Sequence, residues 1–289
     1  MRVLGLSDIH GNVRAVEKMR DLERNEFDLL VVAGDIGNDA AATIFEILAS
    51  FNCPVLYVFG NWDGRLEYDR SFGPTCHHLH MTPYAHDGFV FAGFSGLPVK
   101  WGLNPHAVRL RAEVDARHQA VLDELESLKG APSSDRAKLE RSARYKAFKR
   151  DDAAADIEIL RCNRAGLANL VAESGPERTV VVTHERLTKT HLDMAGVPLF
   201  LYGHRHGFED KSHRGSRFVN VSALDNRVTV EPADPKTADW ELRNVNAGGY
   251  AVIDFDASGV RVTSRQFQVN MAGLVRSKHW RLFAPAIDD

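Results

Sequence analysis

The sequence is poor in the features that mark specialised protein classes. Its 289 residues include only three cysteines, Cys53, Cys76 and Cys162, an odd number without paired spacing. We therefore expect reduced thiols of a cytosolic protein rather than a disulfide framework. No apolar run is longer than a single strand, which excludes a transmembrane helix. The run that follows Met1 and Arg2 is also too short for a signal peptide, so a soluble, cytoplasmic protein is expected.

An excess of charge of either sign is absent as well. The chain has 36 Lys and Arg residues against 39 Asp and Glu residues, which gives a net charge of −3 at pH 7. This balance supports neither a nucleic-acid partner nor a membrane partner, although it leaves room for a local basic patch. Hydrophobic residues make up 44% of the chain and charged residues 26%. Such a composition excludes collagen-like, disordered and membrane-embedded chains and is typical of a soluble globular protein.

What the sequence does contain is an alternation of apolar strands and amphipathic helices. Residues 2–7, 28–33 and 55–59 predict buried strands, and apolar residues at helical spacing predict helices over 12–24 and 39–51. Near-continuous apolar strands separated by helices indicate a mostly parallel sheet with both faces covered, and hence an α/β fold. Further strands are predicted over 89–94, 179–183, 199–202, 217–221, 249–254 and 260–267.

The region 103–172 departs from this alternation. Two stretches with apolar residues at helical spacing flank a break rich in Gly, Pro and Ser at residues 130–134. This pattern predicts an antiparallel helical hairpin, which we interpret as an insertion into a single domain of residues 1–289. The apolar residues of its second stretch are Ile157, Leu160, Leu167 and Val171. Its apolar stripe is expected to form the seam of the hairpin; a lid, or a contact between two copies in a homo-oligomer, is the alternative.

Residue types that commonly bind metal ions follow five of the predicted strands. In chain order they are Asp8 and His10, Asp35, Asn61, His184, and His204 with His206. Because ligands of open α/β sheets bind at the carboxyl ends of the strands, we expect these side chains to meet in one site. Oxygen and imidazole ligands suit divalent Mn, Fe or Zn ions. Seven such groups exceed one tetrahedral shell, which favours two metal ions with a bridging ligand.

Local spacing supports this convergence. Residues two apart on an extended segment point the same way, so Asp8 with His10, and His204 with His206, are each expected to point into the site. Asn12 begins a helix whose N-terminus is able to face a bound anion.

At these residues the sequence resembles the calcineurin-like metallophosphoesterases. The five ordered motifs of that family are matched by Asp8-x-His10, Gly34-Asp35, Gly60-Asn61-Trp62-Asp63, His184 and Gly203-His204-x-His206. The resemblance covers about residues 1–100 and 178–267 and leaves out the helical insertion. It implies a β-sandwich with helices on both outer faces and two metal ions at the edge of the sandwich.

Carried over position by position, the resemblance also implies the ligands and the reaction. Asp8, His10 and His206 would hold one ion, Asn61, His184 and His204 the other, and Asp35 would bridge the two. Two neighbouring cations lower the pKa of a bridging water toward ~7 and polarise the phosphoryl oxygens. The expected function is dinuclear-metal-dependent hydrolysis of phosphoesters, with phosphodiesters, including nucleotide-like ones, favoured over monoesters. A phosphomonoesterase, a protein phosphatase and a non-catalytic metal-binding scaffold for a protein partner are the alternatives.

Trp62 departs from the family pattern, which commonly has His after Gly-Asn. That His is usually assigned to protonate the leaving oxygen, whereas an indole offers only an N–H donor that does not titrate near neutral pH. Either another group, such as His78 or a metal-bound water, supplies the proton, or the substrate carries a good leaving group. We hypothesise that Trp62 stacks on a base or an aromatic leaving group, with packing under a loop as the alternative, and that Asn61 also orients a phosphate oxygen. His78 and His80 are expected to be exposed to solvent.

Overall fold

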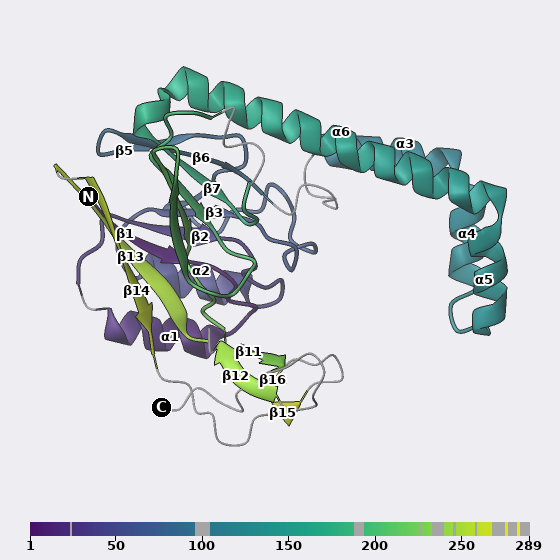
Figure 1. Ribbon diagram of the computed structural model, residues 1–289, viewed down its shortest axis with the longest axis horizontal. Coiled ribbons are helices and arrows are strands. Elements are labelled where there is room, and N and C mark those ends of the chain that lie inside the picture. The colour runs from purple at the N-terminus through teal and green to yellow at the C-terminus, as the bar shows by residue number, and fades with distance from the viewer. Residues whose placement is uncertain are drawn as a thin grey trace. The chain divides into compact units, whose positions relative to one another are not determined.

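The structure is a computed structural model that divides into two compact units (Figure 1). One unit comprises Met1–Gly96 with Leu167–Asp289, and the other Leu97–Gly166. The described residues are 1–23, 25–95, 105–187, 194–225, 227–232, 240–244, 247–257, 259–267, 275–276 and 282–283. The first two residues of the predicted insertion, 103 and 104, lie outside them. Within these ranges, no helix has the length and apolar character needed to cross a membrane.

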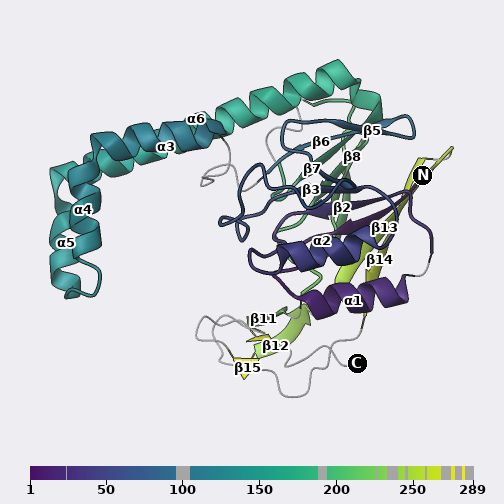
Figure 2. The same cartoon turned by 180° about the vertical axis from the view of Figure 1, so that it is seen from behind.

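The first sheet combines a parallel core with an antiparallel edge. Its strands, in spatial order, are β14 (Gly259–Gln266), β13 (Gly249–Asp256), β1 (Arg2–Leu6), β2 (Leu29–Ala33), β3 (Val55–Val58) and β4 (Cys76–His78). Strands β1 to β4 are parallel, whereas β13 pairs antiparallel with both β1 and β14. Helices α1 (Val13–Leu22) and α2 (Ala41–Ala49) connect the first three strands and cover the outer face of the sheet (Figure 2).

The second sheet has the same mixed character. Its strands, in spatial order, are β5 (Tyr84–His86), β6 (Phe89–Phe94), β7 (Thr179–Thr183), β8 (Leu199–Tyr202), β10 (Ser216–Asn220) and β9 (Glu209–His213). The four central strands are parallel, and the edge strands β5 and β9 are antiparallel to their neighbours. A short 3₁₀-helix, η1 (Pro176–Arg178), precedes β7. A further small sheet contains β12 (Trp240–Asn244), β11 (Arg227–Pro232), β16 (Leu282–Phe283) and β15 (Val275–Arg276).

The two six-stranded sheets pack face to face around one apolar core. Val31 and Val58 from the first sheet and Val182 and Leu201 from the second belong to the same cluster of buried side chains. Burial of a side chain of this size contributes about 1.5–3 kcal/mol. On the other face of the second sheet, Phe200 and Phe218 stack on each other and pack in a second cluster with Leu167 and Val171 of α6 (Ala143–Ser174). The predicted α/β sandwich with helices on both outer faces is confirmed.

Two strands of the sandwich lack the apolar pattern by which the others are recognised. Cys76–His78 (β4) and Glu209–His213 (β9) lie at the edges of the two sheets and consist mostly of polar residues. Edge strands with an exposed face need few apolar residues, which is why periodicity alone does not reveal them.

The second unit consists of α3 (Pro105–Arg117), α4 (Gln119–Ser127), α5 (Ser133–Arg141) and the first part of α6. Helices α3 and α6 run antiparallel, because Arg111 forms ion pairs with Asp152 and Asp156 while His118 contacts Asp151. The chain is thus helical on both sides of the predicted break. The assignment of 103–172 as an insertion into a single domain of residues 1–289 stays a proposal.

The buried face of α6 includes Leu167 and Val171, as predicted, but not Ile157. Ile157 is 69% exposed, whereas Ala155, Ile159 and Asn163 are buried. These three residues are four apart and therefore lie on one face of the helix. Apolar residues three apart and four apart both suit one face of a helix. The sequence pattern therefore placed Ile157 on the buried face, although it lies on the exposed one.

Candidate metal centre

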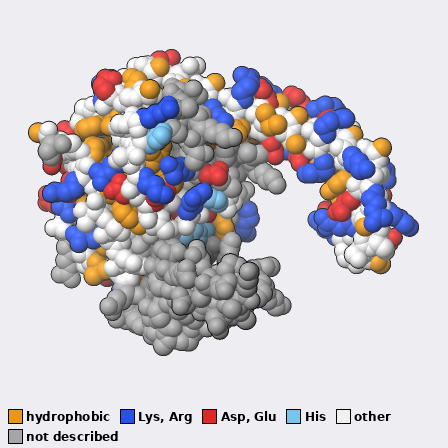
Figure 3. All heavy atoms as spheres, viewed as in Figure 1, with side chains coloured by type: hydrophobic (Ala, Val, Ile, Leu, Met, Phe, Trp, Pro, Cys, Tyr) orange, Lys and Arg blue, Asp and Glu red, His pale blue; other side chains and the backbone are white. Residues whose placement is uncertain are grey.

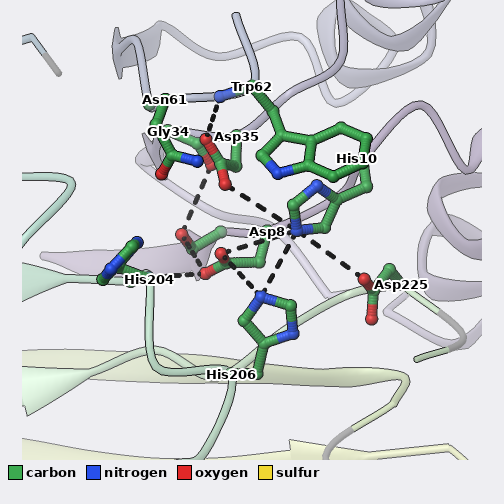
Figure 4. A network of polar contacts seen from close by, with 12 residues as sticks. Asp8, His10, Gly34, Asp35, Asn61, Trp62, His204, His206 and Asp225 are labelled. Carbon is green, nitrogen blue, oxygen red and sulfur yellow. Dashed lines mark hydrogen bonds and ion pairs between the residues drawn. The ribbon is translucent and has the colours of Figure 1, made fainter. Parts of the chain in front are cut away.

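Loops at the carboxyl ends of five strands carry the seven predicted metal-binding residues; all but His184 are labelled in Figure 4. Asp8 and His10 follow β1, Asp35 follows β2, Asn61 follows β3, His184 follows β7, and His204 and His206 follow β8. Strands β1 to β3 belong to the first sheet and β7 and β8 to the second. The seven side chains therefore meet where the edges of the two sheets come together.

The backbone at these residues is turned into the left-handed region. Positive φ angles of 50°, 51°, 55°, 69° and 59° occur at Asp8, His10, Asp35, His204 and His206. This conformation costs non-glycine residues about 1–2 kcal/mol each, and such outliers cluster at functional sites. We predicted that Asp8 and His10, and likewise His204 and His206, point the same way because their backbone is extended. That reason was wrong. These residues lie beyond the strand ends, and left-handed turns, not extended alternation, direct their side chains.

Two glycines permit the close approach of the ligand loops. A Cβ atom at Gly60 would lie 2.2 Å from Asp35 Oδ1, and one at Gly203 would lie 2.6 Å from Asp8 Oδ2 and 1.7 Å from Ser7 Oγ. Real Cβ atoms do not approach other atoms so closely, so both positions require glycine.

The first group of ligand atoms surrounds the ring of His10. Its Nε2 atom lies 3.7 Å from Asp8 Oδ1, 3.8 Å from Asp35 Oδ2 and 3.4 Å from His206 Nε2. Asp8 Oδ1 lies 3.3 Å from His206 Nε2. Asp8, His10 and His206 each offer one ligand atom, all within 4.8 Å of one another.

A second group adjoins the first and shares Asp8 with it. Asp8, Asp35 and His184 again offer ligand atoms within 4.8 Å of one another. His184 Nε2 lies 3.4 Å from Asp35 Oδ2 and 3.1 Å from Asn61 Oδ1. The rings of His184 and His204 are 5.1 Å apart, and the His204 backbone N–H donates to Asp8 Oδ2 at 2.8 Å. All seven predicted residues are thus linked by direct contacts.

The electrostatics of the site keep the Asp8 carboxylate ionised. Burial by itself raises the pKa of the Asp8 carboxyl, but the neighbouring imidazoles of His10, His206 and His184 hold it well below its usual range. Burial by itself lowers the pKa of His184, yet the carboxylates of Asp35 and Asp8 raise it to about 9. Buried ionised groups of this kind are stable when opposite charges face them.

The donor atoms fit divalent metal ions. Asp8 Oδ1 is buried, faces the Nε2 atoms of His10 and His206, and has no hydrogen-bond partner among the described residues. His184 Nδ1 lies 2.8 Å from the Ala33 carbonyl oxygen, to which it donates, so Nε2, which faces Asp35 and Asn61, is the atom that would bind a metal ion on losing its proton. An imidazole fixed in this way by a carbonyl is typical of metal ligands.

Trp62 lies beside this centre with its indole 44% exposed. The indole meets the His10 ring edge-on, with the ring centroids 4.8 Å apart (Figure 4). The backbone holds this position, because the Trp62 N–H donates to Asp35 Oδ1 at 2.8 Å and its carbonyl accepts from Asn38 Nδ2 at 2.6 Å. The indole is therefore open to solvent rather than buried under a loop.

The predicted exposure of His78 and His80 was wrong. His80 is 5% exposed and its Nδ1 accepts from the Ser95 N–H, while His78 stacks on Tyr57 and lies 2.6 Å from Ser95 Oγ. Burial, together with His80, lowers the pKa of His78 to about 3, and burial lowers that of His80 to about 4. His78 is therefore a neutral imidazole at neutral pH, which argues against its protonating the leaving group.

Two acidic residues complete the surroundings of the site. Asp63, in the same motif as Asn61, is buried and accepts hydrogen bonds from the backbone N–H groups of Gly37 and Gly60. It thereby fixes the loop that carries Asn61. Asp225 was missed by the sequence reasoning: its Oδ2 lies 3.7 Å from His10 Nε2. The rule that found the other residues, a ligand type close behind an apolar strand, does not reach it, since it lies five residues beyond the end of β10.

Comparisons with solved structures found matches of low similarity. GAP50, described as the anchor in the inner membrane complex of Plasmodium, is 11% identical with a TM-score of 0.48, over 94% of this chain and 90% of that chain. A conserved Streptococcus pneumoniae protein, described as a predicted phosphoesterase, is 13% identical with a TM-score of 0.35, over 91% and 97%. The phosphopantetheinyl hydrolase of Mycobacterium tuberculosis is 15% identical with a TM-score of 0.37, over 76% and 88%.

Comparisons by sequence are more decisive. Among curated proteins none matches the chain. A family model, however, matches residues 1–208, a range that includes all seven strand-end residues. The model is that of the calcineurin-like phosphoesterases. The chain belongs to this family.

Proposed function

We propose that the protein is a hydrolase of phosphoesters that works with two divalent metal ions and prefers diesters. Membership of the family supports metal-dependent phosphoester hydrolysis in general. The observation that carries the proposal for this chain is the pair of adjoining ligand groups that share the buried carboxylate of Asp8.

The residues present divide into two ligand sets. Asp8, His10 and His206 would hold one ion, Asn61, His184 and His204 the other, and Asp35, whose Oδ2 lies near both His10 and His184, would bridge the two. Two bound divalent ions would activate a water molecule and neutralise charge on the phosphoryl oxygens. The chain itself places the ligands in advance. Its carboxylates are buried at the site, the Ala33 carbonyl orients His184, and glycines let the loops approach one another.

The donor set also bears on the metal. It consists of carboxylates, a carboxamide and imidazoles, without a thiolate. Carboxylate and imidazole ligands suit Mn and Fe ions, whereas thiolate ligands favour softer metals. We therefore propose Mn²⁺ or Fe²⁺ as the working metals, with Zn²⁺ as the competitor to be tested.

The preference for diesters is argued from Trp62. Its half-exposed indole lies next to His10, where the organic part of a substrate bound at the metal centre would emerge. An indole does not supply a proton near neutral pH, so substrates with good leaving groups, or with an aromatic group that stacks on the ring, are favoured. A nucleotide-like diester offers both a base and a substituted phosphate.

The test is to load the purified protein with Mn²⁺ or Fe²⁺, count the bound ions, and measure hydrolysis of a diester and a monoester. Bis(p-nitrophenyl) phosphate is expected to be hydrolysed with a higher kcat/KM than p-nitrophenyl phosphate. A protein that binds two ions per chain but hydrolyses neither compound would refute the proposal and leave the non-catalytic scaffold as the better reading.

A further inference from the structure

We infer that Asp225 is an additional ligand of the metal ion held by Asp8, His10 and His206. This inference rests on the metal centre of the proposed function. It adds a residue that none of the five family motifs contains, from a loop outside the range matched by the family model.

The first support is geometric. Asp225 Oδ2 lies 3.7 Å from His10 Nε2, the same distance as Asp8 Oδ1 and within 0.1 Å of that of Asp35 Oδ2 at 3.8 Å. Figure 4 shows Asp225 on the other side of the His10 nitrogen from Asp35. Three carboxylates and the His206 ring therefore converge on one point from different directions.

The second support is that the loop carrying Asp225 is bonded to the neighbours of two other ligands. Leu224 N–H donates to the carbonyl of Ser7, the residue before Asp8, at 3.0 Å. Ser222 Oγ donates to the carbonyl of His206 at 3.2 Å. Gly248 N–H donates to the carbonyl of Asp225 itself at 2.8 Å. The position of Asp225 relative to Asp8 and His206 is thus set by two main-chain hydrogen bonds and one from the Ser222 side chain.

The third support is electrostatic. Asp225 is 1% exposed, and a buried carboxylate is stable only when it is paired with a cation or coordinates a metal. His10 Nε2 faces Asp225 as well as Asp8 and Asp35, so three carboxylates gather around one imidazole. A divalent cation at their meeting point would be a suitable counter-charge for these carboxylates.

A third carboxylate would make the two metal positions unequal. The ion near His10 would gain an anionic oxygen ligand, whereas the set of Asn61, His184 and His204 brings no carboxylate of its own. Oxygen-rich sites with more than four ligands favour Mn²⁺ over tetrahedral Zn²⁺. The position near His10 is therefore expected to be the tighter of the two for Mn²⁺.

The experiment is calorimetric titration of the chelator-treated full-length protein with Mn²⁺, for wild type, Asp225→Asn, Asp225→Glu and Asp69→Asn. Asp69 is an exposed residue and provides a matched Asp-to-Asn control. Asp225→Asn is expected to weaken one of the two binding steps by about tenfold or more, as loss of a group that supports a metal does, and to leave the other step unchanged. Asp225→Glu, which keeps the carboxylate, is expected to bind the ion more tightly than Asp225→Asn.

A purely structural role predicts a different pattern. In that case Asp225→Asn lowers the melting temperature of the metal-free protein and leaves both Mn²⁺ affinities of the folded fraction at the wild-type values, which would overturn the inference. Should Asp225→Asn fail to fold, Asp225→Ala takes its place, and wild-type Mn²⁺ affinities of Asp225→Ala in both steps would overturn the inference as well. Wild type that binds two ions without hydrolysing any phosphoester refutes the proposed function but not this inference. Wild type that binds no Mn²⁺ refutes both.

Discussion

Two groups of side chains in this molecule have the spacing of metal ligands, and their surroundings differ. One is the cluster at the strand ends around Asp8. The other lies in the helical unit, where His106 of α3 meets Glu158 and Cys162 of α6, again with ligand atoms within 4.8 Å of one another. The strand-end cluster contains carboxylates that are almost fully buried, whereas the Glu158 side chain is 41% exposed.

Glu158 and Cys162 of the helical cluster already have hydrogen-bond partners. Arg161 donates two hydrogen bonds to Glu158, at 2.6 and 2.8 Å, and this contact, first among several, lowers the pKa of the Glu158 carboxyl to about 2. The Cys162 thiol donates to Glu158 at 3.3 Å, and burial together with Glu158 raises the pKa of that thiol. Arg109 Nη2 lies 3.1 Å from His106 Nδ1. Figure 3 shows many Lys and Arg side chains on these helices.

Distances between donor atoms therefore do not decide whether a metal binds. A metal ion in the helical cluster would have to displace a guanidinium and a thiol proton, because metal ligands must be deprotonated. At the strand ends, by contrast, the described groups that lower the pKa of the Asp8 carboxyl are imidazoles, and an imidazole becomes a metal ligand when it loses a proton. Five residues of the strand-end cluster also have strained backbone with positive φ angles. Glu158 and Cys162, by contrast, lie on one face of the regular helix α6.

The largest effect is expected from Asp35→Asn, which removes the carboxylate between His10 and His184. Loss of a group that only supports a ligand already costs about 10–100-fold in metal affinity or activity. We expect loss of a shared ligand to lower kcat/KM for bis(p-nitrophenyl) phosphate by more than about 100-fold and to reduce the bound metal. Asp69→Asn, on the exposed surface, serves as the control and should match wild type. Full activity of Asp35→Asn would mean that the chemistry takes place elsewhere in the molecule.

A smaller effect is expected from Trp62→Ala, which tests whether an aromatic group of the substrate stacks on the indole beside the strand-end cluster. Stacking of a base on an aromatic side chain is worth about 1–3 kcal/mol, or about 5- to 150-fold in binding. KM for aryl diesters is expected to rise by a factor in this range while KM for simple alkyl diesters changes little, and Trp62→Phe should retain most of the difference. Equal changes in KM for both kinds of diester would contradict the stacking hypothesis.

The sequence was sufficient for the parts of the fold and site that repeat a simple pattern. Buried strands such as Val55–Val58 and Thr179–Thr183 are apolar throughout, and residues such as Asp8 and His184 follow them at once. The polar edge strands β4 and β9 have no such signal. The burial of His80 depends on Tyr68 and Ser95, partners distant along the chain that only the folded sheet brings near.

Asp225 shows a second limit of sequence reasoning. It lies five residues beyond the end of β10, and its approach to His10 results from a loop bonded to Ser7 and His206. Nothing in the local sequence encodes those bonds. Resemblance to the family did not help, because its motifs end at His206. The residues most specific to this chain are therefore those that the motifs leave out.

The smallest effect is expected from Cys162→Ser in the helical cluster. Since Arg161 and the thiol proton already satisfy Glu158, we expect the number of metal ions bound per chain and the hydrolysis of bis(p-nitrophenyl) phosphate to equal those of wild type. Co²⁺ is a sensitive probe here, because a thiolate ligand produces a charge-transfer absorption that the oxygen and imidazole ligands at the strand ends do not. Wild type loaded with Co²⁺ should lack this band. A band that is present in wild type and lost in Cys162→Ser would show that the guanidinium is displaced, and donor spacing alone would then be enough to bind a metal in either part of the molecule.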